Sequence, residues 1–151
     1  MVASEHVYGC IAASSGIAVS SSVAITSLML SKFQETAVAK DLKKVMGSTL
    51  PIHLAYIGVG TGAAAAQALK STDPSLQNMW LASAALLASV VPYTHFLVKP
   101  DCEAIFAAGA SGTAPPPGRI ASLVKHGYVR VALMAAGTGI MVVALAKTHR
   151  K

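Results

Sequence analysis

The chain alternates between long apolar segments and short polar connections. Four segments, at about residues 7–30, 48–69, 78–98 and 120–146, are apolar over a length that lets an α-helix cross the hydrocarbon core of a bilayer. Irregular or open-edged backbone is not stable in lipid, so these segments should be helical. The pattern predicts an all-α integral membrane protein, a four-helix bundle of antiparallel spans in one domain covering residues 1–151.

The connections carry signals for shorter elements. Residues 32–47 are polar and partly amphipathic, which predicts a short helix lying in the membrane interface. Pro51 is expected in the first turn of the second span, where its missing N–H costs nothing. A further short helix is predicted over residues 101–108, before the Pro/Gly-rich loop of residues 109–118. No basic region or cleavage site of a signal peptide precedes the first span, so we expect that span to be retained.

Small residues dominate the first two spans. Small residues form two neighbouring helical faces in the first span, one with Ser20, Ala24, Ser27 and Ser31 and the other with Ser15, Ser22 and Thr26. Gly58 and Gly62 form a GxxxG motif in the second span. Small faces let helices approach closely in lipid, so close packing is the expected role, and a homo-oligomer is allowed. A place for Thr26 or Ser27 in a polar cavity is the alternative.

The fourth apolar segment contains a charged residue. Arg130 follows His126 by about one helical turn on the same face. An arginine at the bilayer centre costs about 2.5–3.5 kcal/mol on insertion scales, so it usually faces protein or a water-filled cavity. Arg130 is therefore the first site candidate, with His126 as a titratable neighbour. The alternative is that hydrocarbon begins near Val131 and both side chains extend to the headgroups.

Polar residues of three spans are expected at one membrane face. With antiparallel spans, the end of the first and third and the start of the second and fourth lie together. His53, His95 and His126 each sit near that end, as does Arg130. The layer predicts a site, although an interfacial ring of polar residues without chemistry would give the same pattern.

The third span adds further groups to this layer. Pro92 should kink the helix and free a backbone carbonyl one turn earlier. Tyr56, Tyr93 and Thr94 flank the layer, which would suit a flat, phenolic, lipophilic substrate entering from the bilayer. Histidine is a good general base near neutral pH, and a guanidinium can stabilise a developing oxyanion. These groups together predict removal of a proton from an acidic C–H or phenol.

Composition supports the lipid bilayer as a partner. The 151 residues are 54% hydrophobic and 12% charged, whereas a soluble domain carries about 25% charged residues. The net charge of +6 is spread over loops and tail without interleaved aromatics, so nucleic acid is not an expected partner. A headgroup-facing rim accounts better for the basic residues Lys40, Lys43, Lys44, Arg150 and Lys151. Basic residues are found at both faces, so no orientation is predicted.

A short motif in the third span resembles a known family. Pro92-Tyr93-Thr94, followed by Pro100 and by Arg130 in the fourth span, is similar to the DUF1772 family of small four-span membrane proteins, which includes the fungal anthrone oxygenases. The similarity extends to the small-residue first span and to Pro51. Two positions depart from the family pattern. Asp101 stands where Asn commonly follows the proline, and Gly127 where Asn or His commonly precedes the arginine by three.

The resemblance implies a reaction. Members of the family oxidise an anthrone to an anthraquinone with O₂ in aromatic polyketide biosynthesis, without a flavin, haem or metal cofactor. The implied base is His126, His95 or His53, and Arg130 would hold the oxyanion. Implied substrate contacts are Tyr56, Pro92, Tyr93, Thr94 and Asp101. A fungal member would be a multi-pass protein of the endomembranes, in the endoplasmic reticulum.

Other classes of function stay open. Three histidines could bind copper or iron in a metal-dependent oxidase. A non-enzymatic scaffold or carrier would explain the small-residue faces without any chemistry. Cys10 and Cys102 lack the spacing of a zinc site and are expected to be free thiols.

Overall fold

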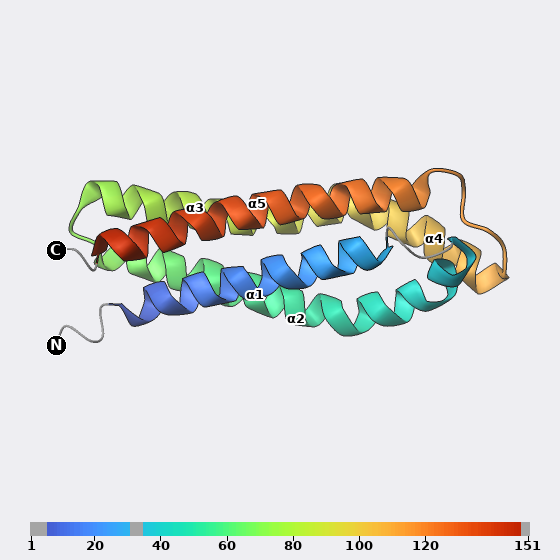
Figure 1. Ribbon diagram of the computed structural model, residues 1–151, viewed down its shortest axis with the longest axis horizontal. Coiled ribbons are helices and arrows are strands. Elements are labelled where there is room, and N and C mark those ends of the chain that lie inside the picture. Colours follow the sequence, from blue (N-terminus) through green and yellow to red (C-terminus); the bar gives the residue numbers. More distant parts are fainter. Residues whose placement is uncertain (1–5, 31–34, 149–151) are drawn as a thin grey trace.

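The computed structural model describes residues 6–30 and 35–148 (Figure 1). Its elements are α1 (Val7–Leu30), α2 (Glu35–Lys70), α3 (Pro74–Tyr93), the π-helix η2 (Thr94–Val98), α4 (Lys99–Ser111) and α5 (Arg119–Thr148). Four stretches of these helices are long and apolar enough to cross a membrane. The predicted all-α transmembrane four-helix bundle is confirmed.

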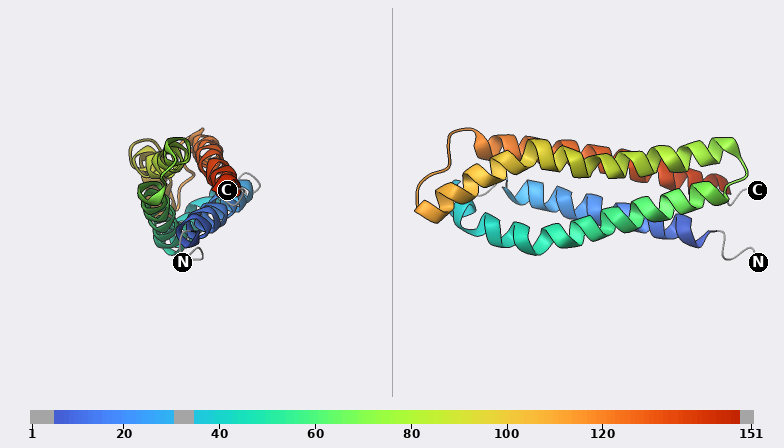
Figure 2. Two further views of the ribbon diagram at one scale, coloured as in Figure 1. Left: turned by 90° about the vertical axis from the view of Figure 1, so that its left-hand side faces the viewer. Right: turned by 180° about the vertical axis from the view of Figure 1, so that it is seen from behind.

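The long helices run antiparallel around a common centre (Figure 2). Each packs against two neighbours, in the cyclic order α1, α2, α3, α5. The start of α1 and the end of α5 lie at one end of the bundle, here called the terminal end. The opposite end, called the loop end, carries α4 and the connection from α4 to α5. The start of α2 and the end of α3 are therefore neighbours at the loop end, as the alternation of spans predicts.

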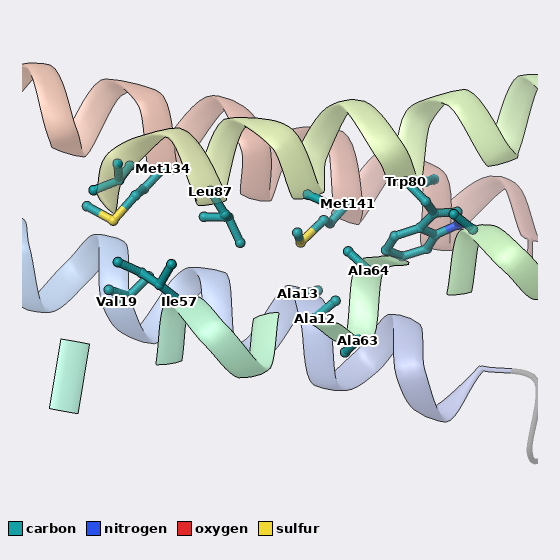
Figure 3. Packing of buried hydrophobic residues seen from close by; sticks show 14 of the residues in the cluster. Ala12, Ala13, Val19, Ile57, Ala63, Ala64, Trp80, Leu87, Met134 and Met141 are labelled. Atoms are coloured by element: carbon teal, nitrogen blue, oxygen red, sulfur yellow. The ribbon is translucent and has the colours of Figure 1, made fainter. Parts of the chain in front are cut away.

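The main core fills the bundle between these ends. Its largest fully buried side chains include Trp80, Leu87, Met134 and Met141 (Figure 3). Trp80 lies against Gly9, where a Cβ would come within 3.1 Å of the indole ring. The glycine thus makes room for the only tryptophan in the chain.

A second, smaller apolar cluster closes the loop end. This loop-end cluster comprises Leu42, Val98, Cys102, Ile105, Ile120 and Leu123. Its members come from α2, η2, α4 and α5, so α4 is held across the end of the bundle. The cluster and the main core share no buried residue, and the layer between them is polar.

Three local predictions need correction. The expected interfacial helix and the second span form one helix, α2, since Leu42 is buried in the loop-end cluster and gives the first part of α2 a packing partner. Pro51 consequently lies inside α2 and not in its first turn. Residues 31–34 of the predicted connection lie outside the described part of the chain. Gly58 and Gly62 face outward with no atom within 4 Å of an added Cβ, so the GxxxG motif does not pack inside the bundle.

The third span ends much as the sequence suggests. The backbone N–H of Thr94 donates to the carbonyls of Val90 and Val91, and the chain passes from α3 into η2. A π-helical turn of this kind widens a helix locally and is frequent at functional sites. Pro92 lies inside α3, two residues before this π-helix, and the kink at Pro92 stays a prediction. The short helix predicted over residues 101–108 is confirmed as part of α4, which ends at Gly112 with a φ of 69°.

Candidate functional site

A layer of polar side chains lies between the main core and the loop-end cluster. We call it the polar layer and define it by Ser22, His53, Tyr93, His126 and Arg130. The five residues come from α1, α2, α3 and α5, so every long helix contributes to it. Polar groups at this depth are expensive unless they meet partners in the protein, which makes their contacts informative.

The first pair joins α1 to α2. Nε2 of His53 lies 2.6 Å from Oγ of Ser22, and the imidazole is half-buried. The carbonyl of Ser22 in turn accepts a hydrogen bond of 2.9 Å from Oγ1 of Thr26. One ring nitrogen of His53 is therefore held by a hydroxyl group from the neighbouring helix.

The second pair joins α3 to α5. The hydroxyl of Tyr93 lies 2.7 Å from Nδ1 of His126, and the two rings meet edge to face with centroids 5.6 Å apart. Tyr93 is the last residue of α3 before the π-helix, so its place is coupled to that change of helix type. The two histidines share an arrangement, since each has one ring nitrogen on the hydroxyl of an adjacent helix.

Arg130 lies among these pairs. Its Nε is buried and has no hydrogen-bond partner in the described part of the chain. The guanidinium lies close enough to His53, Tyr93 and Cys102, on α2, α3 and α4, for its charge to act on their ionisation. The side chain is thus directed into the bundle and not out toward the headgroups. A buried N–H donor without a partner is a place where an acceptor would be stabilised.

Close packing of α1 on α5 borders the layer at Gly127. A Cβ at this position would come within 3.0 Å of Cβ of Ser27 and would overlap its hydroxyl. The side chain of an Asn or His could not be accommodated here without moving α1. Glycine at position 127 therefore has a steric reason in this fold.

Asp101 is committed to partners in the protein. It is 4% exposed, and its Oδ1 lies 2.6 Å from a guanidinium nitrogen of Arg119, while Ser122 donates a side-chain hydrogen bond to it. The contacts tie α4 to the first turn of α5 beneath the polar layer. The carboxylate also interacts electrostatically with His126.

Other predicted site residues lie outside the layer. His95 is exposed, and its ring stacks edge to face on Phe96, which is 71% exposed. Tyr56 and Pro92 are also exposed, and Thr94 is half-buried. Of the predicted histidines, the structure brings His53 and His126 to the layer and leaves His95 on the outer surface.

Sequence reasoning missed two contacts in this region. Ser22 was assigned to a small-residue packing face, although it holds His53. Sγ of the buried Cys102 lies 3.5 Å from Sδ of Met46, a contact between α4 and α2. The sequence signal for Ser22 is its place one turn before Thr26 on one face of the first span. The Cys102 contact joins residues far apart in the chain and has no local signal.

Within residues 6–30 and 35–148, no three His, Cys, Asp or Glu side chains are grouped so that they could hold a metal ion. Comparison of the chain with known protein families, with curated proteins and with solved structures finds no match.

Proposed function

We propose that this protein is a membrane-embedded, anthrone oxygenase-like enzyme that oxidises an anthrone or a related phenolic polyketide to a quinone with O₂. The reaction would be assisted by a base and would use no redox cofactor. The observation that carries the proposal is the buried, unpartnered Nε of Arg130 beside two imidazoles that are each fixed by a hydroxyl group. The resemblance to the DUF1772 family supplies the reaction class.

The chemistry fits these groups. An anthrone carries two hydrogens on C10, a doubly benzylic carbon acidified by the carbonyl across the ring. A histidine would remove one proton to give an electron-rich anion, and Arg130 would stabilise the oxygen that takes up the negative charge. The anion can pass electrons to O₂ without a metal. The products are the quinone and one water molecule.

The position of the polar layer suits a lipophilic substrate. On three helices an exposed lysine is followed, toward the middle of the bundle, by an exposed apolar side chain. The three pairs are Lys44 and Val45, Lys99 and Leu97, and Lys125 and Tyr128. Such a change marks the boundary between headgroups and hydrocarbon. His126 is near that level and Arg130 is about one turn deeper. An aromatic molecule dissolved in the bilayer would reach this depth without crossing water. For a fungal protein, the proposed location is the endoplasmic reticulum.

An assay of anthrone oxidation tests the proposal. Membranes containing the protein would be supplied with emodin anthrone, and O₂ uptake and quinone absorbance would be followed against empty membranes. The expected result is quinone formation well above the spontaneous rate, with one O₂ consumed per quinone. A rate equal to that of empty membranes would contradict the proposal and favour a scaffold or carrier. Activity abolished by chelation and restored by one metal would favour a metal-dependent oxidase instead.

A further inference from the structure

The two histidines of the polar layer come from helices that do not pack directly on each other. α2 and α5 occupy opposite corners of the bundle, since each packs on α1 and on α3. His53 and His126 therefore approach the bundle interior from opposite sides. Arg130, on α5, reaches far enough across to interact electrostatically with His53. A molecule held by Arg130 in the bundle interior would lie between the two helices that carry the imidazoles.

The hydroxyl partners of the two rings differ in acidity, and this difference favours a different tautomer for each histidine. A tyrosine hydroxyl is much more acidic than a serine hydroxyl, with a usual pKa of about 10, so Tyr93 is the better donor to an imidazole nitrogen. With Tyr93 donating to Nδ1 of His126, that ring carries its own proton on Nε2. The Ser22 hydroxyl can accept from Nε2–H of His53, which leaves Nδ1 of His53 with a free lone pair.

From this arrangement we propose that the histidines have separate roles. His53, positioned by Ser22, is the base that takes the first proton from the substrate. His126 is the donor that protonates the peroxide formed with O₂, and Tyr93 replaces its proton. The assignment rests on the proposed function and deepens it. In this assignment Tyr93 becomes a phenolate when it gives up its proton. The positive charge of Arg130, which acts on the ionisation of Tyr93, would stabilise that phenolate.

The proton and electron balance closes over one turnover. Nδ1 of His53 takes a proton from C10, and the carbanion gives its electrons to O₂ as the C–O bond forms. The resulting peroxide anion receives the Nε2 proton of His126, while the Tyr93 proton moves to Nδ1. The second C10 proton then returns through His126 to Tyr93, and the O–O bond breaks. Hydroxide leaves with the proton held by His53, giving the quinone and water.

The two roles predict that substitutions of His53 and of Tyr93 impair different steps of the reaction. His53→Ala should lower both anthrone-dependent O₂ uptake and quinone formation by about 100-fold or more, the usual range for loss of a general base. Tyr93→Phe removes only the hydroxyl that resupplies the proton of His126, so it should lower quinone formation more than O₂ uptake. Quinone formation should then lag behind O₂ uptake, and an organic hydroperoxide should accumulate in acid-quenched samples.

Ser22 provides a test that a packing role would not mimic. Ser22→Ala should lower the rate constant for O₂ uptake with little change in the anthrone concentration at half-maximal rate, because His53 loses its orientation and the substrate contacts remain. Ser22→Thr keeps a hydroxyl at this position and should restore the rate. Ala24→Ser, a change of similar size on the same helix, serves as the matched control and should have no effect.

The decisive experiment measures O₂ uptake, quinone and hydroperoxide together, for the full chain in liposomes, normalised to correctly inserted protein. His53→Gln replaces His53→Ala if the latter fails to insert. Hydroperoxide accumulation by Tyr93→Phe but not by the His53 variant is the expected result. Equal loss of O₂ uptake in both variants without hydroperoxide, or failure of Ser22→Thr to restore the rate, would overturn the role assignment. A parent protein without anthrone-dependent O₂ uptake would instead overturn the proposed function itself.

Discussion

Buried polar groups are bonded differently in the half of the bundle near the terminal end, here called the terminal half, and in the polar layer. In the terminal half, Oε1 of Gln67 and Nε1 of Trp80 are buried without hydrogen-bond partners among the described residues. In the polar layer Nε of Arg130 also lacks a partner among the described residues, but His53 and His126 each bond to a hydroxyl group on a neighbouring helix. Packing therefore determines the geometry of the terminal half, whereas hydrogen bonds between helices fix the orientation of side chains in the polar layer. Orientation of this kind is what a catalytic site needs.

The helix register explains how the terminal half is arranged. Leu87 on α3 packs against Gly60 on α2, where an added Cβ would lie 3.2 Å from its side chain. Gln67 follows Gly60 by seven residues on α2, and Trp80 precedes Leu87 by seven residues on the antiparallel α3, so both lie about two turns nearer the terminal end. They should therefore face each other as Gly60 and Leu87 do. An amide oxygen and an indole N–H would then occupy one layer of the main core, although neither has a hydrogen-bond partner among the described residues.

The largest expected effect is loss of packing at Trp80. The side chain is fully buried and lies in contact with α1. Trp80→Ala should lower the free energy of unfolding by about 3 kcal/mol, the low end of the range for large core truncations, because lipid and not water surrounds the bundle. Leu81→Ala, next in the chain but exposed, is the control and should change little. Unfolding would be followed by circular dichroism during titration with SDS. Equal effects of the two variants would contradict the packing account.

A second prediction concerns the approach of α1 to α5 beside the polar layer. Gly127→Leu should destabilise the protein by about 1–3 kcal/mol, since the new side chain meets Ser27. Gly139, in the same helix, has open space around it. Gly139→Leu should therefore be neutral or slightly stabilising, because leucine has a higher helix propensity than glycine. The same SDS titration measures both. Stabilisation by Gly127→Leu would show that the two helices do not approach closely here.

The fold was largely predictable, while the site was predictable only in part. Apolar length alone identified four spans, and helix alternation brought His53, His126 and Arg130 to one end. The continuity of α2 depends on burial of Leu42 against α4, a contact between segments far apart in the chain. His95 is exposed together with Val91 and Pro92, which lie one turn earlier on the same face, and the sequence does not show which face of this helix packs inward.

A third prediction tests the ion pair beneath the polar layer. Arg119 is 46% exposed and its partner Asp101 is buried, so solvent weakens the interaction from one side. Arg119→Ala should cost about 1 kcal/mol, discounted for that exposure. Lys99→Ala removes the exposed pair with Glu103 in the same part of the chain and should cost less than about 0.5 kcal/mol. Thermal denaturation in detergent, followed by circular dichroism, compares the two. A larger loss for Lys99→Ala would contradict the assignment of Arg119 as the tie between α4 and α5.

The smallest change in the free energy of unfolding is expected at Gln67. The sign of this change should differ between Gln67 in the terminal half and Ser22 in the polar layer. Gln67→Leu replaces a buried acceptor that has no partner and should leave the free energy of unfolding unchanged or raise it by about 1 kcal/mol. Ser22→Ala removes the hydrogen-bond partner of His53 and should lower the free energy of unfolding by a similar amount. Emission of Trp80, the only tryptophan, can follow unfolding in both variants. Destabilisation by Gln67→Leu greater than that by Ser22→Ala would reverse the comparison.

The central claim is that Arg130 serves chemistry and not membrane anchoring. Anthrone-dependent quinone formation, normalised to correctly inserted protein, tests it most directly in the parent, Arg130→Lys and Arg130→Leu. Lysine keeps the charge but lacks the planar fork of donors, so Arg130→Lys should insert normally with reduced turnover. Arg130→Leu removes a costly buried charge together with the oxyanion partner, and should insert at least as well as the parent with little activity. Full activity of Arg130→Leu, or failure of both variants to accumulate while the parent inserts, would contradict the claim.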